Sequence, residues 1–388
     1  MADPRTVFLE DVRRIAAETA APNADDVDRR ARFPVESIDA LKEIGALSAL
    51  VPVEYGGGGL PFGTVAAACF ELGRTCGASA MVFAMHQIQV ACIVRHLDGS
   101  PWFEEYLREL AGGQRLIASV TSEVGTGGDI GRSIAAVTPG ANGLCSFEKK
   151  ATTVSYGSNA DDLLTTLRRA PDADESDQVM VLTTGDQLTL EQMGAWDPLG
   201  MRGTCSPPFV VRAEFPAGQV LATSCRQILT ETMVPVSHIL WSHLWLGIAT
   251  DAFDRARAFV RAQKREPNAE PPAAALRLSE LLAELQLLRG EVTGALRDYE
   301  EIMDEPGRER LGTLAAALRF NTLKLAASEQ APRVCEGAMG IAGIGGYRND
   351  TPYSVGRHLR DTMSARLMIA NERIHQRNAG LLLIAKEV

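Results

Sequence analysis

The sequence has little of three features that would assign it to a common class of protein. Its seven cysteines form no CxxC pair, and an odd number of scattered thiols predicts reduced cysteines rather than a disulfide framework. A formal net charge of -10 argues against a general nucleic-acid-binding protein. No uninterrupted apolar run is long enough to span a membrane, and the first residues are polar. We therefore expect a cytoplasmic protein without a membrane segment, a signal peptide or a metal site.

The apolar residues that are present follow different periodicities along the 388 residues, a length that suits two or three domains. Helical spacing at both ends surrounds a middle part with short alternating runs separated by Gly, Pro and Asp. We expect an α+β protein with an N-terminal α-helical domain (1–117), a middle antiparallel β-barrel or β-sandwich domain (118–225) and a C-terminal four-helix bundle (226–388). The four long bundle helices are expected at Ile239–Ala262, from Pro271-Pro272 onward, at Glu309–Glu329 and at Arg357–Ile384.

The most informative segment is a glycine-rich turn that follows a short apolar strand, at Ala118–Asp129. Its glycines allow backbone N–H groups to approach a flat or anionic ligand, and Thr121 adds a hydroxyl at the strand end. By itself the segment is typical of a hairpin loop that binds nothing. Two further segments follow it in order: Lys150–Asp161, and Gly343–Tyr347, which leads to Arg360-Asp361.

In this order and spacing, the three segments and the α–β–α domain order resemble the acyl-CoA dehydrogenase superfamily of flavoproteins. Val51–Gly57 also resembles the family's "VPEEYGG" loop, and Met201–Thr204 resembles its "GxRGS/T" loop. The resemblance implies an FAD cofactor, whose flat ring needs hydrogen-bond donors at its edge. In the family, the loop that corresponds to Gly343–Tyr347 approaches the cofactor of a neighbouring subunit. The residues implied for FAD binding are Val120, Thr121, Gly127, Gly128, Thr153, Ser155, Gly343 and Asn371.

The sequence lacks the catalytic Glu of the family at both of its usual positions. Ile369 occupies the position near the C-terminus, and Ser237 occupies the alternative position on the first bundle helix. The residues that remain as candidate bases are His238, Glu372 and His243, in that order. A neutral imidazole accepts a proton near pH 7, so a histidine base predicts a rate that rises between about pH 6 and 7. The alternatives are a hydrogen-bonded core role for each histidine and a solvated Glu372–Arg373 pair.

The resemblance implies α,β-dehydrogenation of an acyl thioester carried on coenzyme A or an acyl carrier protein. The α-proton is removed while a hydride passes from the β-carbon to the flavin, and the electrons go to an electron-transfer flavoprotein or oxygen. A flavin-dependent monooxygenase on the same fold, which needs no Glu base, is the first alternative. A non-catalytic flavin-binding member is the second. A Leu-rich face on the second bundle helix also predicts a homodimer or homotetramer. We expect no nucleic-acid or membrane partner.

Overall fold

Helices make up the N-terminal part of the protein. The computed structural model describes residues 3–140, 143–263, 273–304 and 308–386. The helices that precede the first strand are α1 (Pro4–Ile15), α2 (Ala21–Arg30), α3 (Val35–Glu43), α4 (Phe62–Gly73), α5 (Gly77–His96) and α6 (Pro101–Gly113). Asp3 caps α1 by accepting a hydrogen bond from the Arg5 backbone N–H, and a proline in the first turn starts the same helix without losing a hydrogen bond.

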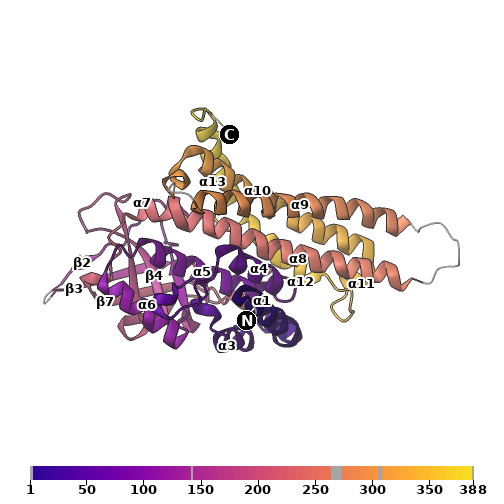
Figure 1. Ribbon diagram of the computed structural model, residues 1–388, viewed down its shortest axis with the longest axis horizontal. Coiled ribbons are helices and arrows are strands. Elements are labelled where there is room, and N and C mark those ends of the chain that lie inside the picture. Colours follow the sequence, from indigo (N-terminus) through magenta and orange to yellow (C-terminus); the bar gives the residue numbers. More distant parts are fainter. Residues whose placement is uncertain (1–2, 141–142, 264–272, 305–307, 387–388) are drawn as a thin grey trace.

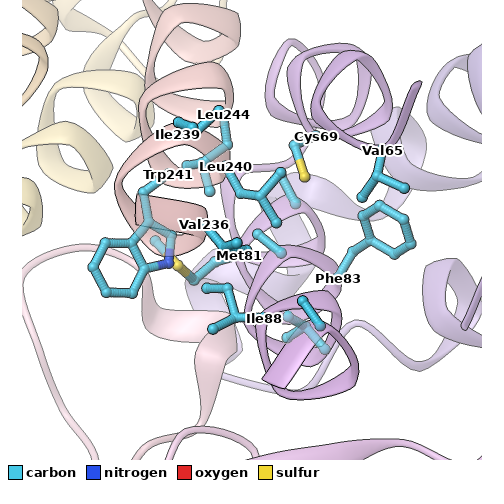
Figure 2. Close-up of a cluster of buried hydrophobic side chains, with 14 of the residues drawn as sticks. Val65, Cys69, Met81, Phe83, Ile88, Val236, Ile239, Leu240, Trp241 and Leu244 are labelled. Carbon is cyan, nitrogen blue, oxygen red and sulfur yellow. The ribbon is translucent and has the colours of Figure 1, made fainter. Parts of the chain in front are cut away.

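The helix α5 is long and apolar enough to cross a membrane when judged by length and composition. Its apolar residues are not consecutive, because His86, Gln87 and Gln89 interrupt them, but the mean hydropathy of its best window is 1.5. Within the protein, 89% of that window is buried. Figure 2 shows Met81 and Ile88 of α5 among the apolar side chains of the neighbouring helices. This burial is what a core helix of a folded domain shows.

The central region consists of two open sheets. One sheet has the order β1-β4-β5 and the other has the order β2-β3-β7-β6. The strands are β1 (Ile117–Val120), β2 (Thr138–Pro139), β3 (Leu144–Ala151), β4 (Asp162–Arg168), β5 (Gln178–Thr184), β6 (Leu188–Gln192) and β7 (Phe209–Pro216). The strand β1 pairs parallel with β4, whereas the other pairs are antiparallel. The prediction was an antiparallel barrel or sandwich, and the structure has two open sheets instead of a closed barrel. The β1–β4 pair is parallel because β1, which follows the helical domain, runs in the same direction as β4.

Three long helices run side by side in the C-terminal region (Figure 1). They are α8 (Val234–Ala262), α9 (Ala273–Asp304) and α10 (Leu314–Ala342), and the short helices α7 (Cys225–Ile228) and α11 (Ile344–Tyr347) flank them. The predicted start of the second helix at Pro271-Pro272 lies outside the described residues. On α9, Leu281, Leu285 and Leu288 are buried as the Leu-rich face predicted, whereas Leu282 is 41% exposed.

The fourth predicted helix is interrupted. Instead of one helix over Arg357–Ile384, the structure has α12 (Gly356–Met363) and α13 (Asn371–Leu382). The break coincides with Ile369 and Ala370, whose φ angles are 55° and 36°. A right-handed helix does not continue through positive φ, and a β-branched residue adopts it at a steric cost. The prediction of a continuous helix was wrong here, and the break includes Ile369, which was singled out from the sequence as a candidate position for a catalytic residue.

Candidate functional site

The glycine-rich turn leaves β1 with three glycines in positive-φ conformations. The φ angles are 97° at Gly125, 61° at Gly127 and 83° at Gly128, which side chains with a Cβ adopt only with strain. Gly127 and Gly128 are exposed, so their N–H groups are accessible to a ligand. Val120 is buried at the end of β1, and Thr121 after it is half-buried. The turn thus has the backbone geometry that the sequence predicted.

A buried ion pair between Glu123 and Lys149 lies at the start of this turn. This pair was not predicted from the sequence. The carboxylate of Glu123 accepts hydrogen bonds from the backbone N–H groups of Ile134 (3.0 Å) and Ala135 (2.6 Å) and from the Ser133 hydroxyl (2.8 Å). The Lys149 ammonium lies 3.6 Å from the same carboxylate, and burial lowers the pKa of this lysine to about 8. Because its acceptors are all bonded, Glu123 fixes the turn and is not available as a base.

Two predicted cofactor residues at the end of β3 lie beside the turn. The Ser122 hydroxyl donates to the Thr153 carbonyl (2.7 Å) and accepts from the Thr153 N–H (3.1 Å). The Ser206 hydroxyl donates to the Ser155 hydroxyl oxygen (2.9 Å), and Ser206 is also bonded to Thr204. These bonds bring the ends of β1 and β3 and the loop before β7 together. Thr153 is exposed and Ser155 is half-buried, so both border a surface that a flat ligand can approach.

The first turn of α13 reaches the glycine turn through an arginine that the prediction did not include. The Arg373 guanidinium Nη2 donates to the backbone carbonyl of Gly127. A Cβ on Gly127 would lie 3.2 Å from this guanidinium nitrogen, so the absence of a side chain is what admits the contact. The two residues are 246 positions apart in the chain. The contact places a permanent positive charge beside exposed backbone N–H groups, which is a suitable arrangement for a phosphate.

Asn371, which was predicted to bind the cofactor, is held by α10. Its side-chain oxygen accepts from the Lys324 ammonium (2.5 Å), and its amide nitrogen donates to Ser328 (3.0 Å) and Glu329 (3.0 Å). The side chain is buried, and its polar atoms are bonded within the bundle. Asn371 therefore anchors the start of α13 directly after the strained Ile369–Ala370 turn.

His238 is the candidate base that combines burial with a free ring nitrogen. Its Nδ1 lies 3.0 Å from the Phe320 carbonyl, and since a carbonyl only accepts, Nδ1 carries the proton. Its Nε2 is buried and has no hydrogen-bond partner among the described residues. Burial, together with the charge of Lys324, lowers the pKa of His238 to about 3. A rate rising between pH 6 and 7 does not follow from this environment, because the imidazole stays neutral across that range.

The other two candidate bases are placed differently. His243 donates from Nδ1 to the Ile239 carbonyl of its own helix (2.8 Å), and burial lowers its pKa to about 4. Glu372 is exposed at the start of α13. Burial lowers the pKa of Lys324 to about 8, and the charge of Glu372 acts in the opposite direction. Which of the three residues accepts a proton stays a prediction.

Gly343 and the Arg360-Asp361 pair lie away from this cluster. Gly343 links α10 to α11 at the end of the bundle that is remote from the strands (Figure 1), with φ at 56°. Asp361 accepts from the Met201 N–H (2.6 Å), and burial raises its pKa to about 6. Arg360 pairs with Asp28 of α2. The Arg-Asp motif therefore joins the N-terminal helices, the β region and the bundle.

The residues at the junction fit a flavin. The hydroxyls of Thr121 and Ser155 border the site at the strand ends, and exposed N–H groups at Gly127 and Gly128 lie next to the Arg373 guanidinium. The unpartnered Nε2 of His238 and indole nitrogen of Trp241 are buried polar atoms that a bound molecule would satisfy. A flat ring system with a phosphate-bearing chain has the complementary hydrogen-bonding groups.

The chain is similar over most of its length to proteins that include the following three. It is 25% identical to cyclohex-1-ene-1-carbonyl-CoA dehydrogenase of Syntrophus aciditrophicus, covering 99% of this chain and 91% of the relative. It is 27% identical to the probable acyl-CoA dehydrogenase YngJ of Bacillus subtilis, covering 94% and 92%. It is also 24% identical to the probable FMNH2-dependent monooxygenase SfnC of Pseudomonas putida, covering 86% and 84%.

Solved structures with the same fold include an acyl-CoA dehydrogenase and an FMN-bound protein. Butyryl-CoA dehydrogenase from Megasphaera elsdenii superposes with a TM-score of 0.82 at 20% identity, covering 99% of both chains. FMN-bound TdsC from Paenibacillus sp. A11-2 superposes with a TM-score of 0.84 at 20% identity, covering 97% of both chains.

The family comparison agrees with the order of domains in the chain. Residues 4–114 match the N-terminal domain of acyl-CoA dehydrogenase, and residues 231–378 match its C-terminal domain. Together these matches include α1 to α6 and α8 to α13, which carry Arg373, Asn371 and His238. The chain belongs to the acyl-CoA dehydrogenase family.

Proposed function

We propose that this protein is a flavin-dependent oxidoreductase that introduces a double bond between the α- and β-carbons of an acyl thioester. The observation that carries the proposal is the contact of Arg373 with the glycine turn, in a chain with both helical domains of the family. The first turn of α13, which carries Arg373, is also bonded through Asn371 to Lys324 of α10, the helix whose Phe320 carbonyl bonds His238. The thioester is carried on coenzyme A or on an acyl carrier protein.

Each part of the junction has a separate role in this proposal. Thr121 and Ser155 would hold the edge of the flavin ring, and Gly127, Gly128 and Arg373 would hold the phosphate part of FAD. When bound, the flavin supplies the acceptor for the hydride from the β-carbon. His238 accepts the α-proton at Nε2, the one ring nitrogen that carries a lone pair. An electron-transfer flavoprotein or oxygen then receives the electrons.

Anaerobic mixing with a panel of acyl-CoA and acyl-carrier-protein thioesters tests the proposal. We expect the visible absorbance band that makes the oxidised flavin yellow to disappear with at least one thioester. His238→Ala lowers that rate about 100-fold or more while the flavin remains bound, because general base catalysis contributes about 10²- to 10⁴-fold. His243→Ala on the same helix tests the third candidate base, and we expect a smaller loss of rate there than in His238→Ala.

Two results would redirect the assignment of the base. Full activity of His238→Ala would remove His238 from the mechanism and leave Glu372 as the next candidate. Faster dehydrogenation of a simple acyl-CoA by Ile369→Glu would support the correspondence of Ile369 with the family's catalytic Glu. A protein that stays yellow with every thioester would contradict the dehydrogenase proposal.

A flavin-dependent monooxygenase is the second candidate. It is favoured by the Ile at position 369 and by the low pKa of His238, which makes this histidine a weak proton acceptor. The similarity to SfnC gives independent support. Oxygen consumption that depends on added reduced FMN would favour this function, whereas FAD that copurifies tightly would favour the dehydrogenase.

We also propose that the enzyme is a cytoplasmic homodimer or homotetramer. Ile344 and Tyr347, next to Gly343, are 72% and 70% exposed, as expected of a loop that a neighbouring subunit covers. The seven cysteines are free, which suits a reducing compartment. Light scattering at micromolar concentration checks the assembly, and a mass near the 41.7 kDa of one chain would contradict it.

A further inference from the structure

A groove with a volume of about 330 Å³ lies between α4, α8 and α9, and no proposed step of the reaction uses it. Its apolar lining includes Phe253, Leu282 and Leu285. The helices α4 and α8, which carry part of the lining, are in close backbone contact. A Cβ on Gly247 would lie 2.3 Å from the Phe70 carbonyl oxygen, so the helices approach as closely as glycine permits. The volume falls within the range of about 300–1,000 Å³ that is usual for small-molecule sites.

Cationic side chains also line the groove. Arg74, Arg257 and Arg289 belong to the lining together with a single carboxylate, that of Asp254. Asp254 is shared, because its oxygens lie 3.3 Å from the Arg74 guanidinium and 2.8 Å from the Arg257 guanidinium. Arg74 has a second partner outside the lining, the Glu71 carboxylate, at 3.7 Å.

Arg289 is the unpaired member of this set. Its guanidinium lies over the Phe70 ring, 5.6 Å from the ring centre, and forms no ion pair with a carboxylate among the described residues. The Nε atoms of Arg289 and Arg74 are shielded from solvent and have no hydrogen-bond partner in the described part of the chain. Arg289 is therefore a cation in the lining of the groove without a carboxylate partner among the described residues, and an anionic group in the groove would compensate its charge.

We propose that this groove binds an alkyl carboxylate. The carboxylate accepts hydrogen bonds from Arg289 and Arg74, and the alkyl chain lies along Phe253, Leu282 and Leu285. The groove lies on α4, α8 and α9, and none of the residues that line it belongs to the flavin junction. The site is therefore separate from the one at which the proposed oxidation takes place, and it does not depend on that proposed function.

Titration calorimetry of the full-length protein with octanoate tests the site. Arg289→Gln should raise the Kd at least 10-fold, because a charge-assisted hydrogen bond is lost. Arg297→Gln is the matched control, since Arg297 is an exposed arginine on the same helix outside the groove. Leu282→Gln should raise the Kd several-fold, whereas Leu287→Gln should not, because Leu287 is 71% exposed and does not line the groove.

Ligand variation separates the contributions of head group and chain. Octanol should bind at least 10-fold more weakly than octanoate, and acetate should not bind measurably. An octanoate affinity that is unchanged in both Arg289→Gln and Leu282→Gln would overturn the proposal, as would no binding to the wild-type protein. Tighter binding of octyl phosphate than of octanoate would overturn the choice of a carboxylate head group. Each variant should retain the wild-type flavin spectrum, which shows that the junction is intact.

Discussion

Two junctions between secondary-structure elements each contain a buried histidine, and the two histidines differ in how many ring nitrogens are bonded. At the junction of α5 with β1, His86 donates from Nε2 to the Leu47 carbonyl (2.7 Å) and accepts at Nδ1 from the Ile117 N–H (3.0 Å). At the junction of α8 with α10, His238 has a partner at Nδ1 and none at Nε2 among the described residues.

This difference separates a structural histidine from a candidate catalytic one. Both side chains are fully buried, and burial lowers the pKa of His86 to about 4 and that of His238 to about 3. Burial and titration therefore do not distinguish them. A protein gains stability by bonding both ring nitrogens, so a buried nitrogen left unbonded is a cost that a function at that position would explain.

The largest expected effect is on stability. His86→Ala leaves the Ile117 N–H and the Leu47 carbonyl without partners and should lower the free energy of unfolding by about 4 kcal/mol. His238→Ala removes the same atoms but breaks one hydrogen bond, so we expect a loss of about 2 kcal/mol. Urea unfolding at pH 7.5 gives both values. Equal losses in the two variants would remove the distinction between the junctions.

A smaller effect concerns the acid range. The folded-state pKa of His86 is about 4, below its ordinary value of about 6.5, so the unfolded chain binds the proton first as the pH falls. The contribution of His86 to stability is therefore complete above pH 6.5 and is lost as the pH falls through 4. His86→Gln should make the decline in stability between these values shallower by roughly 1 kcal/mol per pH unit. The exposed His375, changed to Gln, should leave the slope unchanged.

Sequence patterns predicted the parts of the molecule that depend on local residues. Helical spacing predicted most of α8, and the glycines within Ala118–Asp129 predicted a turn after a short strand. The patterns did not indicate contacts between distant segments. No sequence pattern near Gly127 indicates that Arg373 bonds to its carbonyl. No pattern near Glu123 identifies Lys149 as its partner. The break at Ile369 was also missed, because neither isoleucine nor alanine is a residue type that ends helices.

The smallest expected effect tests whether the backbone is strained at Ile369–Ala370. Asn371, directly after this turn, bonds to Lys324 of α10, the helix that also provides the Phe320 carbonyl bonded to His238. Ala370 has φ at 36°, a conformation that costs an alanine about 1–2 kcal/mol relative to glycine. Ala370→Gly should therefore raise the free energy of unfolding by about 0.5–1 kcal/mol, after subtraction of the greater freedom of glycine in the unfolded chain.

The matched control for this variant lies on α13. Ala379 is exposed in the regular part of the helix, and Ala379→Gly should lower stability by about 1 kcal/mol, because glycine is a poor helix former. Opposite signs in the two variants, measured by urea unfolding, would show that the turn before Asn371 is held against its backbone preference. A loss of stability in Ala370→Gly equal to that in Ala379→Gly would show that the turn is unstrained. The His238 junction would then differ from the His86 junction only in its unbonded nitrogen.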